Sequence, residues 1–575
     1  MGNNRKDILL KHKNDPSQLK ILESTSNNLM IEAPAGYGKT KTLISKIKLI
    51  LCDKELPKHK KILCLTFSVN AAYKIKKDVL ESFSELDLNP EEYLVIGNFH
   101  SLARKILKKY GYLLDKNFRN LENFKVISTE EIFDEVKIIS DQEKEIISEF
   151  TNNLRAGFAP ADFQDNLLEQ YNGIVKKYLI DSQCITYDAI LTFAIELLHN
   201  NLEIRGFYNE YFRIVIIDEF QDTNILGWTL VQLFLTEQTR KIFLGDSLQR
   251  IYGFIGAIPS LIDIVTEKFN MEYIPLTMNH RFSSNPELLN LEKVVRDNAN
   301  QVKNTDVNNK VKINFSYLNT QYDESQRIFE IIDKILHENE STKIAILVKQ
   351  RGDNINFIKQ YLEANNINIF DGLFTDEDSE YLKFHNICLK YFTENFGKNR
   401  FFLKKDIEVF CRKIFQDSSN EKSKSFLELL KVALISITNE KNYFARNELI
   451  MDLFANKGLK NYLDKIDDNV MVTTVHASKG LEWDYILLPD MEQGLFPNYF
   501  GLCQKNTCIF KNNCNLKVTK NNESKFIEEI SVFYVAITRA KKDIFFTASK
   551  NQLFFGKDKP ANLSCLLSLP GILFK

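Results

Sequence analysis

A glycine-containing segment at residues 33–40 has the composition of a loop that binds a triphosphate. It lies between an apolar run and a segment with helical periodicity. Small residues let backbone N–H groups wrap phosphates, and a helix N-terminus adds positive potential. Lys39 would reach the β and γ oxygens, and Thr40 would coordinate Mg²⁺. Because Ala33 replaces the usual first glycine, a glycine turn that caps a helix stays open as the alternative, and downstream residues decide.

Two adjacent carboxylates, Asp218 and Glu219, follow the apolar run 214–217. The carboxyl end of a buried strand is where α/β sheets place ligands. One carboxylate could hold Mg²⁺ while the other polarises the attacking water, and a helix N-cap is the alternative interpretation. A third run at 242–244 leads to Gln249, whose neutral amide could sense the γ-phosphate or order water.

Short apolar runs alternate with helical patterns along the chain, which is typical of βαβ units and parallel sheets. The runs are apolar on successive residues, so we expect strands buried on both faces between helices. They lie at 29–32, 62–67, 214–217, 242–244, 344–348, 470–474, 485–488 and 544–547. Two stretches without such runs, about 105–183 and 371–465, predict helical insertions. In the first, residues 128–131 predict a capping-box start for a helix.

Length and composition limit the class of protein. The 575 residues exceed any single small domain, and 21 glycines and 12 prolines exclude a collagen-like or linker-rich chain. Lys plus Arg number 75 against 76 Asp plus Glu, so any nucleic-acid site must be a local groove. The charged N-terminus and the lack of a long apolar run predict a cytoplasmic protein with no membrane partner.

Nine cysteines, an odd number, fit reduced thiols better than a disulfide framework. Three of them cluster, Cys503, Cys508 and Cys514. Metal sites usually have tighter spacing and four ligands, and Cys565 is the candidate for a fourth. A zinc or iron–sulfur site and free loop thiols both stay open.

The motifs resemble, in order and spacing, those of UvrD/Rep-type superfamily 1 DNA helicases. The first evidence is the phosphate-binding segment, Ile-Asp-Glu-Phe-Gln-Asp-Thr-Asn at 217–224 and Gly-Asp-x-x-Gln-x-Ile-Tyr-Gly-Phe-x-Gly-Ala at 245–257. Further blocks agree along nearly the whole chain, at 16–18, 66–72, 98–103, 279–281, 474–482, 492–497 and 534–540.

The resemblance implies an α/β fold of two RecA-like P-loop domains with parallel sheets, each carrying a mainly helical insertion, with ATP in the cleft between them. It places the first RecA-like domain at 1–104 and 184–270 and its insertion at 105–183. The second domain is expected at 271–370 and 466–575, with a shortened insertion at 371–465.

The resemblance also implies roles at the nucleotide. Gln18 would read adenine, His280 replaces a stacking tyrosine, and Arg281 and Arg539 would reach the phosphates from the second domain. The implied catalytic residues are Lys39, Asp218, Glu219, Gln249, Arg281 and Arg539. The implied ATP-binding residues are Gln18, Ala35, Gly36, Gly38, Lys39, Thr40, His280, Gly480 and Glu482, with Thr40 and Asp218 as ligands of Mg²⁺.

Single-stranded DNA needs aromatic platforms and phosphate contacts, although any one aromatic residue could instead pack in a core. The implied DNA-binding residues are Thr66, Phe67, Asn70, His100, Tyr252, Phe254, His476 and Lys479. Two further positions depart from the family pattern, and the second of them, Ile255, lies beside the predicted DNA path. Gly227 stands where the family often has glutamine, and Ile255 removes a positive charge.

Three functions stay open. The first is an ATP-dependent translocase and helicase that acts on single-stranded DNA and single-strand/duplex junctions with 3′-to-5′ polarity, in DNA repair, recombination or antiviral defence against foreign DNA. The second is an ATP-gated DNA-binding switch that activates or loads a partner nuclease, which the short second insertion and Ile255 favour. The third, a P-loop scaffold without hydrolysis, is disfavoured because the implied catalytic residues are all present.

Overall fold

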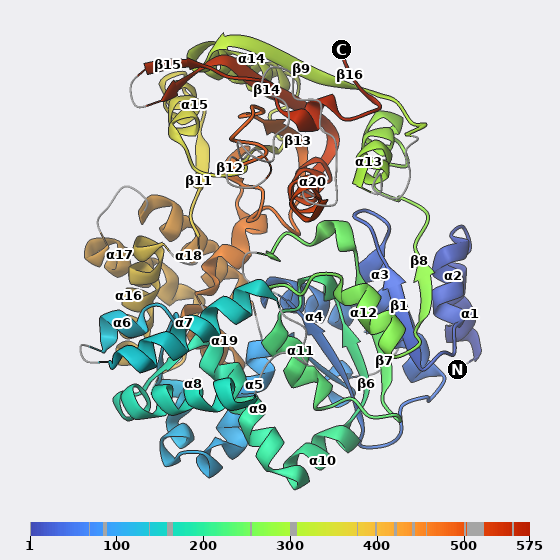
Figure 1. Ribbon diagram of the computed structural model, residues 1–575, viewed down its shortest axis with the longest axis vertical. Helices are drawn as coiled ribbons and strands as arrows, with labels where there is room; N and C mark the ends of the chain where they lie inside the picture. Colours follow the sequence, from blue (N-terminus) through green and yellow to red (C-terminus); the bar gives the residue numbers. More distant parts are fainter. Residues whose placement is uncertain are drawn as a thin grey trace. The chain divides into compact units, whose positions relative to one another are not determined.

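The computed structural model divides the chain into two compact units, Met1–His280 and Arg281–Lys575, each built on a parallel sheet (Figure 1). The residues described are 2–67, 69–83, 89–136, 139–157, 165–253, 256–299, 307–375, 378–396, 400–418, 423–439, 443–455, 457–498, 502, 523–554 and 557–575.

The first unit contains a six-stranded sheet in the order β3-β2-β6-β7-β1-β8, and all of its strand pairs are parallel. Its strands are β1 (Asn28–Glu32), β2 (Lys61–Thr66), β3 (Leu94–Asn98), β6 (Phe212–Ile217), β7 (Arg240–Gly245) and β8 (Glu272–Pro275). Because β8 pairs with β1, the first unit continues past residue 270, where the sequence placed its end.

Alternate residues of these strands point into two different cores. Ile214 and Ile216 lie in one core, and Val215 and Ile217 lie in the other. The first core includes residues of α3 (Lys39–Cys52) and α4 (Val69–Phe83); the second includes residues of α5 (Phe99–Tyr110), α9 (Tyr187–Asn200), α11 (Ile225–Gln232) and α12 (Leu261–Lys268). The prediction of strands that are buried on both faces between helices is therefore confirmed.

The stretch 105–183 is mainly helical, as predicted, and contains α6 (Ile132–Glu135), α7 (Asp141–Ala156) and α8 (Asp165–Tyr178). The predicted capping box forms, since Ser128 N donates to Glu131 Oε2 at 2.6 Å and Glu131 N donates to Ser128 Oγ at 3.2 Å. The helix after it, however, is only the four-residue α6. The sequence did not predict a two-stranded parallel sheet of β4 (Lys125–Ile127) and β5 (Cys184–Thr186).

Of the remaining helices of the first unit, two pack against α3 and the third directly precedes β6. They are α1 (Gly2–Leu10), α2 (Pro16–Glu23) and α10 (Leu202–Tyr211).

The second unit contains an eight-stranded sheet in the order β11-β12-β10-β13-β14-β9-β16, with β15 paired antiparallel to β14. Its strands are β9 (Val311–Thr320), β10 (Ile344–Val348), β11 (Ile369–Gly372), β12 (Val470–Thr474), β13 (Trp483–Leu488), β14 (Ala540–Phe554), β15 (Lys557–Pro560) and β16 (Ile572–Phe574). Its helices α13 (Pro286–Ala299), α14 (Gln321–Glu338), α15 (Asp353–Ala364) and α20 (Glu523–Ile537) accompany the sheet.

The described part of the second predicted insertion, 371–465, is mainly helical, although residues 371–372 at its start belong to β11. It contains α16 (Ser379–Asn395), α17 (Ile407–Asp417), α18 (Ser423–Thr438) and α19 (Tyr443–Ala455). Packed phenylalanine rings join these helices, and the rings of Phe410 and Phe454 stack at 5.8 Å. Within the described ranges no helix has the length and apolar character needed to span a membrane.

Candidate active site

The loop between β1 and α3 has the backbone geometry of a phosphate-binding loop. Gly36 and Gly38 have φ of +86° and +80°, a left-handed conformation that favours glycine. Gly38 is also the N-cap of α3, so the first N–H groups of this helix open toward the loop. A Cβ on Gly38 would lie 2.6 Å from Gln18 Nε2, so a side chain at this position would displace the Gln18 amide.

Lys39 brings the loop together with the carboxylates that follow β6. Its Nζ lies 3.0 Å from Asp218 Oδ1 and donates a hydrogen bond to Glu219 Oε1. Burial alone would lower the pKa of Lys39, but the charges of Asp218 and Glu219 raise it above its ordinary value. Burial raises the pKa of Asp218, and the Lys39 charge opposes that shift. Lys39 is therefore a charged residue that neutralises both acids.

The donor set also fits Mg²⁺. Thr40 and Asp218 offer a hydroxyl and a carboxylate, which are the hard oxygen ligands that Mg²⁺ prefers. Asp218 is buried, and its Oδ1 lies 3.0 Å from Lys39 Nζ, so this carboxylate already faces a positive charge. Gln249 lies in the turn after β7, the strand that pairs with β6, and its Nε2 donates to Asp246 Oδ2 at 2.8 Å.

The adenine-reading residues expected from the sequence, Gln18 and His280, meet at the phosphate-binding loop. His280 N donates to Gly36 O at 2.9 Å, and its Nε2 lies 3.1 Å from Gln18 Nε2 and 2.8 Å from Asp15 Oδ2. Asp15 is the N-cap of α2 and accepts from Gln18 N at 3.0 Å. Burial would raise the pKa of Asp15, but hydrogen bonds from Ser17, Gln18 and His280 lower it.

Sequence reasoning assigned no role to Asp15 or to Gln221, and both join the site. The signal for Asp15 was its position directly before Pro16, which is typical of a helix N-cap. Gln221 lies inside the block 217–224 and contacts Glu219 through its side-chain amide.

In the second unit, Arg281 binds two of the expected site segments. It pairs with Glu482 and donates a hydrogen bond to Thr538 O. Arg539 is 3% exposed, and its guanidinium donates to Val535 O at 3.0 Å and Leu481 O at 3.2 Å. The arginine expected to reach phosphate is thus held by backbone carbonyls of its own unit.

The loop after β12 carries the remaining expected residues of the second unit. Its turn is closed by hydrogen bonds such as Ser478 N to Thr474 O at 3.0 Å. Gly480 is exposed and left-handed, with φ of +85°. His476 and Lys479, which precede it, are partly exposed in this loop.

The structure brings two of the expected DNA-stacking rings together. Phe67 and Tyr252 stack with centroids 4.9 Å apart and 24° between their planes. Burial lowers the pKa of His100 to about 4, so this residue is neutral near pH 7 and offers a hydrogen bond or a ring rather than a charge. Thr66 differs from the expectation, because its side chain is fully buried at the end of a central strand and has no surface to offer DNA.

Several expected residues lie outside the described part of the chain. They are Phe254 and Ile255, the side chain of Asn70, and the cluster Cys503, Cys508 and Cys514. Cys565 is described, and it is a buried free thiol. No group of three or more His, Cys, Asp or Glu side chains in the described ranges could hold a metal ion.

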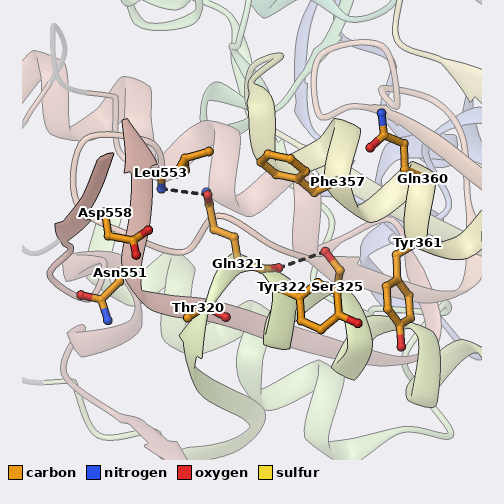
Figure 2. Close-up of a pocket in the computed structure, with 10 residues that line it drawn as sticks. All are labelled: Thr320, Gln321, Tyr322, Ser325, Phe357, Gln360, Tyr361, Asn551, Leu553 and Asp558. Carbon is orange, nitrogen blue, oxygen red and sulfur yellow. Dashed lines mark hydrogen bonds between the residues drawn. The ribbon is translucent and has the colours of Figure 1, made fainter. Parts of the chain in front are cut away.

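A separate hollow of about 420 Å³ lies in the second unit (Figure 2). The Tyr322 and Tyr361 rings meet edge to face there at 5.6 Å, and Leu553 N donates to Gln321 Oε1 at 3.0 Å. Its lining residues are Thr320, Gln321, Tyr322, Ser325, Phe357, Gln360, Tyr361, Asn551, Leu553 and Asp558. Since its one charged lining side chain among the described residues is a carboxylate, the hollow is not suited to phosphate.

The fold and the site define a class of protein, the P-loop nucleotide hydrolases with parallel RecA-like sheets. Comparison with protein families identifies the family within this class. Residues 14–270 match the UvrD/REP helicase N-terminal domain, and residues 376–551 match the UvrD-like helicase C-terminal domain. The chain belongs to the UvrD/REP family of ATP-dependent DNA helicases, in superfamily 1, so the resemblance seen in the motifs is confirmed.

Curated relatives are similar over nearly the whole chain. A probable DNA helicase II homolog of Rickettsia conorii is 26% identical and covers 95% of this chain and 94% of its own length. The ATP-dependent DNA helicase Rep of Buchnera aphidicola is 23% identical, with 94% of each chain covered. The ATP-dependent DNA helicase PcrA of Staphylococcus aureus is 23% identical, with 96% of this chain and 85% of the relative covered.

Proposed function

We propose that this protein is an ATP-driven translocase on single-stranded DNA that unwinds duplex with 3′-to-5′ polarity. The observation that supports this most directly is the contact of Lys39 with both Asp218 and Glu219 beside a left-handed glycine loop. A cation, a metal-binding carboxylate and a second carboxylate are the groups that phosphoryl transfer to water requires. Family membership supplies the DNA as the second ligand.

Each residue of the site has a proposed task. Lys39 leaves the carboxylates and binds the β and γ oxygens when ATP enters. Thr40 and Asp218 would hold Mg²⁺, which would neutralise charge on those oxygens. Glu219 takes the proton of the attacking water. Gln18 and His280 hold the adenine ring, because both already lie against the loop.

Arg281 and Arg539 complete the proposed site from the second RecA-like domain, together with Gly480 and Glu482. Guanidinium groups would stabilise the charge that spreads over the transferring phosphoryl group. We also propose 105–183 and 371–465 as the insertions of the two domains. Repair, recombination or defence against foreign DNA is the proposed setting, at single-strand/duplex junctions.

A second candidate is an ATP-gated DNA-binding switch that loads a partner nuclease and unwinds little. The observation that favours it is the burial of Arg539, because a guanidinium that stays on Val535 and Leu481 carbonyls does not reach phosphate. The two candidates differ in movement along DNA.

The test is strand displacement with ATP on duplexes that carry a single-stranded tail at the 3′ or the 5′ end. A translocating helicase of the proposed polarity displaces the strand from the 3′-tailed duplex, and Lys39→Ala displaces neither. ATP-dependent binding without displacement from either duplex would support the switch instead.

A further inference from the structure

The side-chain amide of Gln221 lies between two parts of the proposed catalytic site. Gln221 belongs to a 3-10 turn, Phe220–Asp222, directly after Glu219, and is 2% exposed. Its Nε2 donates to Glu219 Oε2 at 2.7 Å, and its Oε1 accepts from Asp246 N at 3.0 Å. The amide therefore uses both of its polar atoms within the site.

Backbone chemistry determines which way this amide faces. A backbone N–H can only donate, so the Gln221 atom that faces Asp246 N must be the oxygen. The nitrogen then faces Glu219, where it offers a donor to the carboxylate. A glutamate at this position could keep the bond to Asp246 but would place a second carboxylate against Glu219.

The end of β7 is shaped around the same amide. A Cβ on Gly245 would lie 2.7 Å from Gln221 Oε1, closer than real Cβ contacts come. Glycine at this strand end therefore makes room for Gln221. Asp246 continues the contact, since its Oδ2 accepts from Gln249 Nε2 at 2.8 Å.

Glu219 itself is held in an unusual conformation. Its φ is +53°, in the left-handed region that non-glycine residues rarely adopt. Lys39 binds one of its carboxylate oxygens and Gln221 binds the other. When a nucleotide enters and Lys39 moves to its phosphates, the bond from Gln221 remains to orient the carboxylate.

We propose that Gln221 is a positioning residue for ATP hydrolysis, which orients the Glu219 carboxylate and ties it to the turn that carries Gln249. The assignment rests on the proposed function, because it takes Glu219 as the base. A hydrogen-bond chain then runs from the base through Gln221 and Asp246 to the amide expected to sense the γ-phosphate. Loss of Gln221 affects turnover rather than ATP binding, because its amide contacts the base and not the expected phosphate cradle.

The test uses Gln221→Met, which has similar length without a donor, and Gln221→Glu, which has the same shape without a donor. Gln238→Glu is the matched control, because Gln238 is an exposed amide of the same unit that accepts from Arg213 Nη1 at 2.7 Å. Steady-state hydrolysis is measured with single-stranded DNA, alongside equilibrium binding of a non-hydrolysable ATP analogue and thermal unfolding.

We expect both Gln221 variants to lower kcat by about 10–100-fold, by analogy with the loss of a hydrogen-bond partner that orients a metal ligand. KM and analogue binding should stay near wild type. Gln238→Glu should behave as wild type. The positioning role would be overturned if either Gln221 variant kept the wild-type kcat. It would also be overturned if both variants lost affinity for the analogue by the same factor as they lost kcat. Wild-type protein without DNA-stimulated hydrolysis would instead overturn the proposed function.

Discussion

Lys39→Ala should destabilise the first unit in addition to abolishing hydrolysis, because Lys39 neutralises two carboxylates inside the fold. The Lys39, Asp218 and Glu219 side chains are 14%, 6% and 23% exposed. Removing one partner of a buried ion pair costs about 3–5 kcal/mol. Since Glu219 is partly solvated, we expect the low end, about 3 kcal/mol, or on the order of 100-fold in the folding equilibrium.

The loss should depend on pH. Burial already raises the pKa of Asp218, and without the opposing Lys39 charge that pKa rises further. A carboxyl group with a raised pKa in the folded state keeps a proton that the unfolded chain releases, so folding weakens as pH rises. The stability deficit of Lys39→Ala is therefore largest at neutral pH and shrinks as pH falls toward about 4.

The assay is urea unfolding of wild type, Lys39→Ala and the double variant Lys39→Ala/Asp218→Asn, each at pH 7 and pH 5. The double variant should recover part of the loss at pH 7, because the amide removes one of the two like charges. The neutralising role of Lys39 would be refuted if Lys39→Ala were as stable as wild type at pH 7. It would also be refuted if the double variant were less stable than Lys39→Ala.

Three further predictions concern other parts of the molecule. Glu219→Gln should bind ATP with near wild-type affinity and stop turnover, since the amide cannot accept the proton of water; normal turnover would mean another base. Tyr252→Ala should weaken the binding of single-stranded DNA by about 1–3 kcal/mol, because a base would stack on this ring beside Phe67. Fluorescence anisotropy measures the affinity, and an unchanged affinity would place Tyr252 outside the DNA path. Burial raises the pKa of Glu324 to about 7 and the pKa of Asp490 to about 6. The free energy of unfolding of the second unit, measured with urea, should therefore fall from pH 5 to pH 8, and Glu324→Gln should flatten that trend. A free energy of unfolding that rises over this range would contradict the raised pKa values.

The central strands could be predicted from the sequence because their residues are apolar in succession. Ile214 to Ile217 supply side chains to two cores, which a surface strand could not do. β9 and β4 were not predicted. β9 mixes polar and apolar residues, and β4 has three residues, so neither has an uninterrupted apolar run.

The residues of the candidate site could be predicted where a local sequence motif contains them. They could not be predicted where they meet only through packing between distant parts of the chain. Lys39 and Glu219 were found from loop and strand-end patterns, and they do meet. The contact of Asp15 with His280 spans 265 positions, and no local pattern reports it. The burial of Thr66 and Arg539 likewise follows from the surrounding tertiary packing, which local motif spacing does not describe.

The most direct test of the account is the rate of ATP hydrolysis by the purified protein with and without a single-stranded oligonucleotide. The account predicts slow hydrolysis alone, strong stimulation by the oligonucleotide, and loss of both rates in Lys39→Ala. A hydrolysis rate that the oligonucleotide does not change, or that survives in Lys39→Ala, would contradict it.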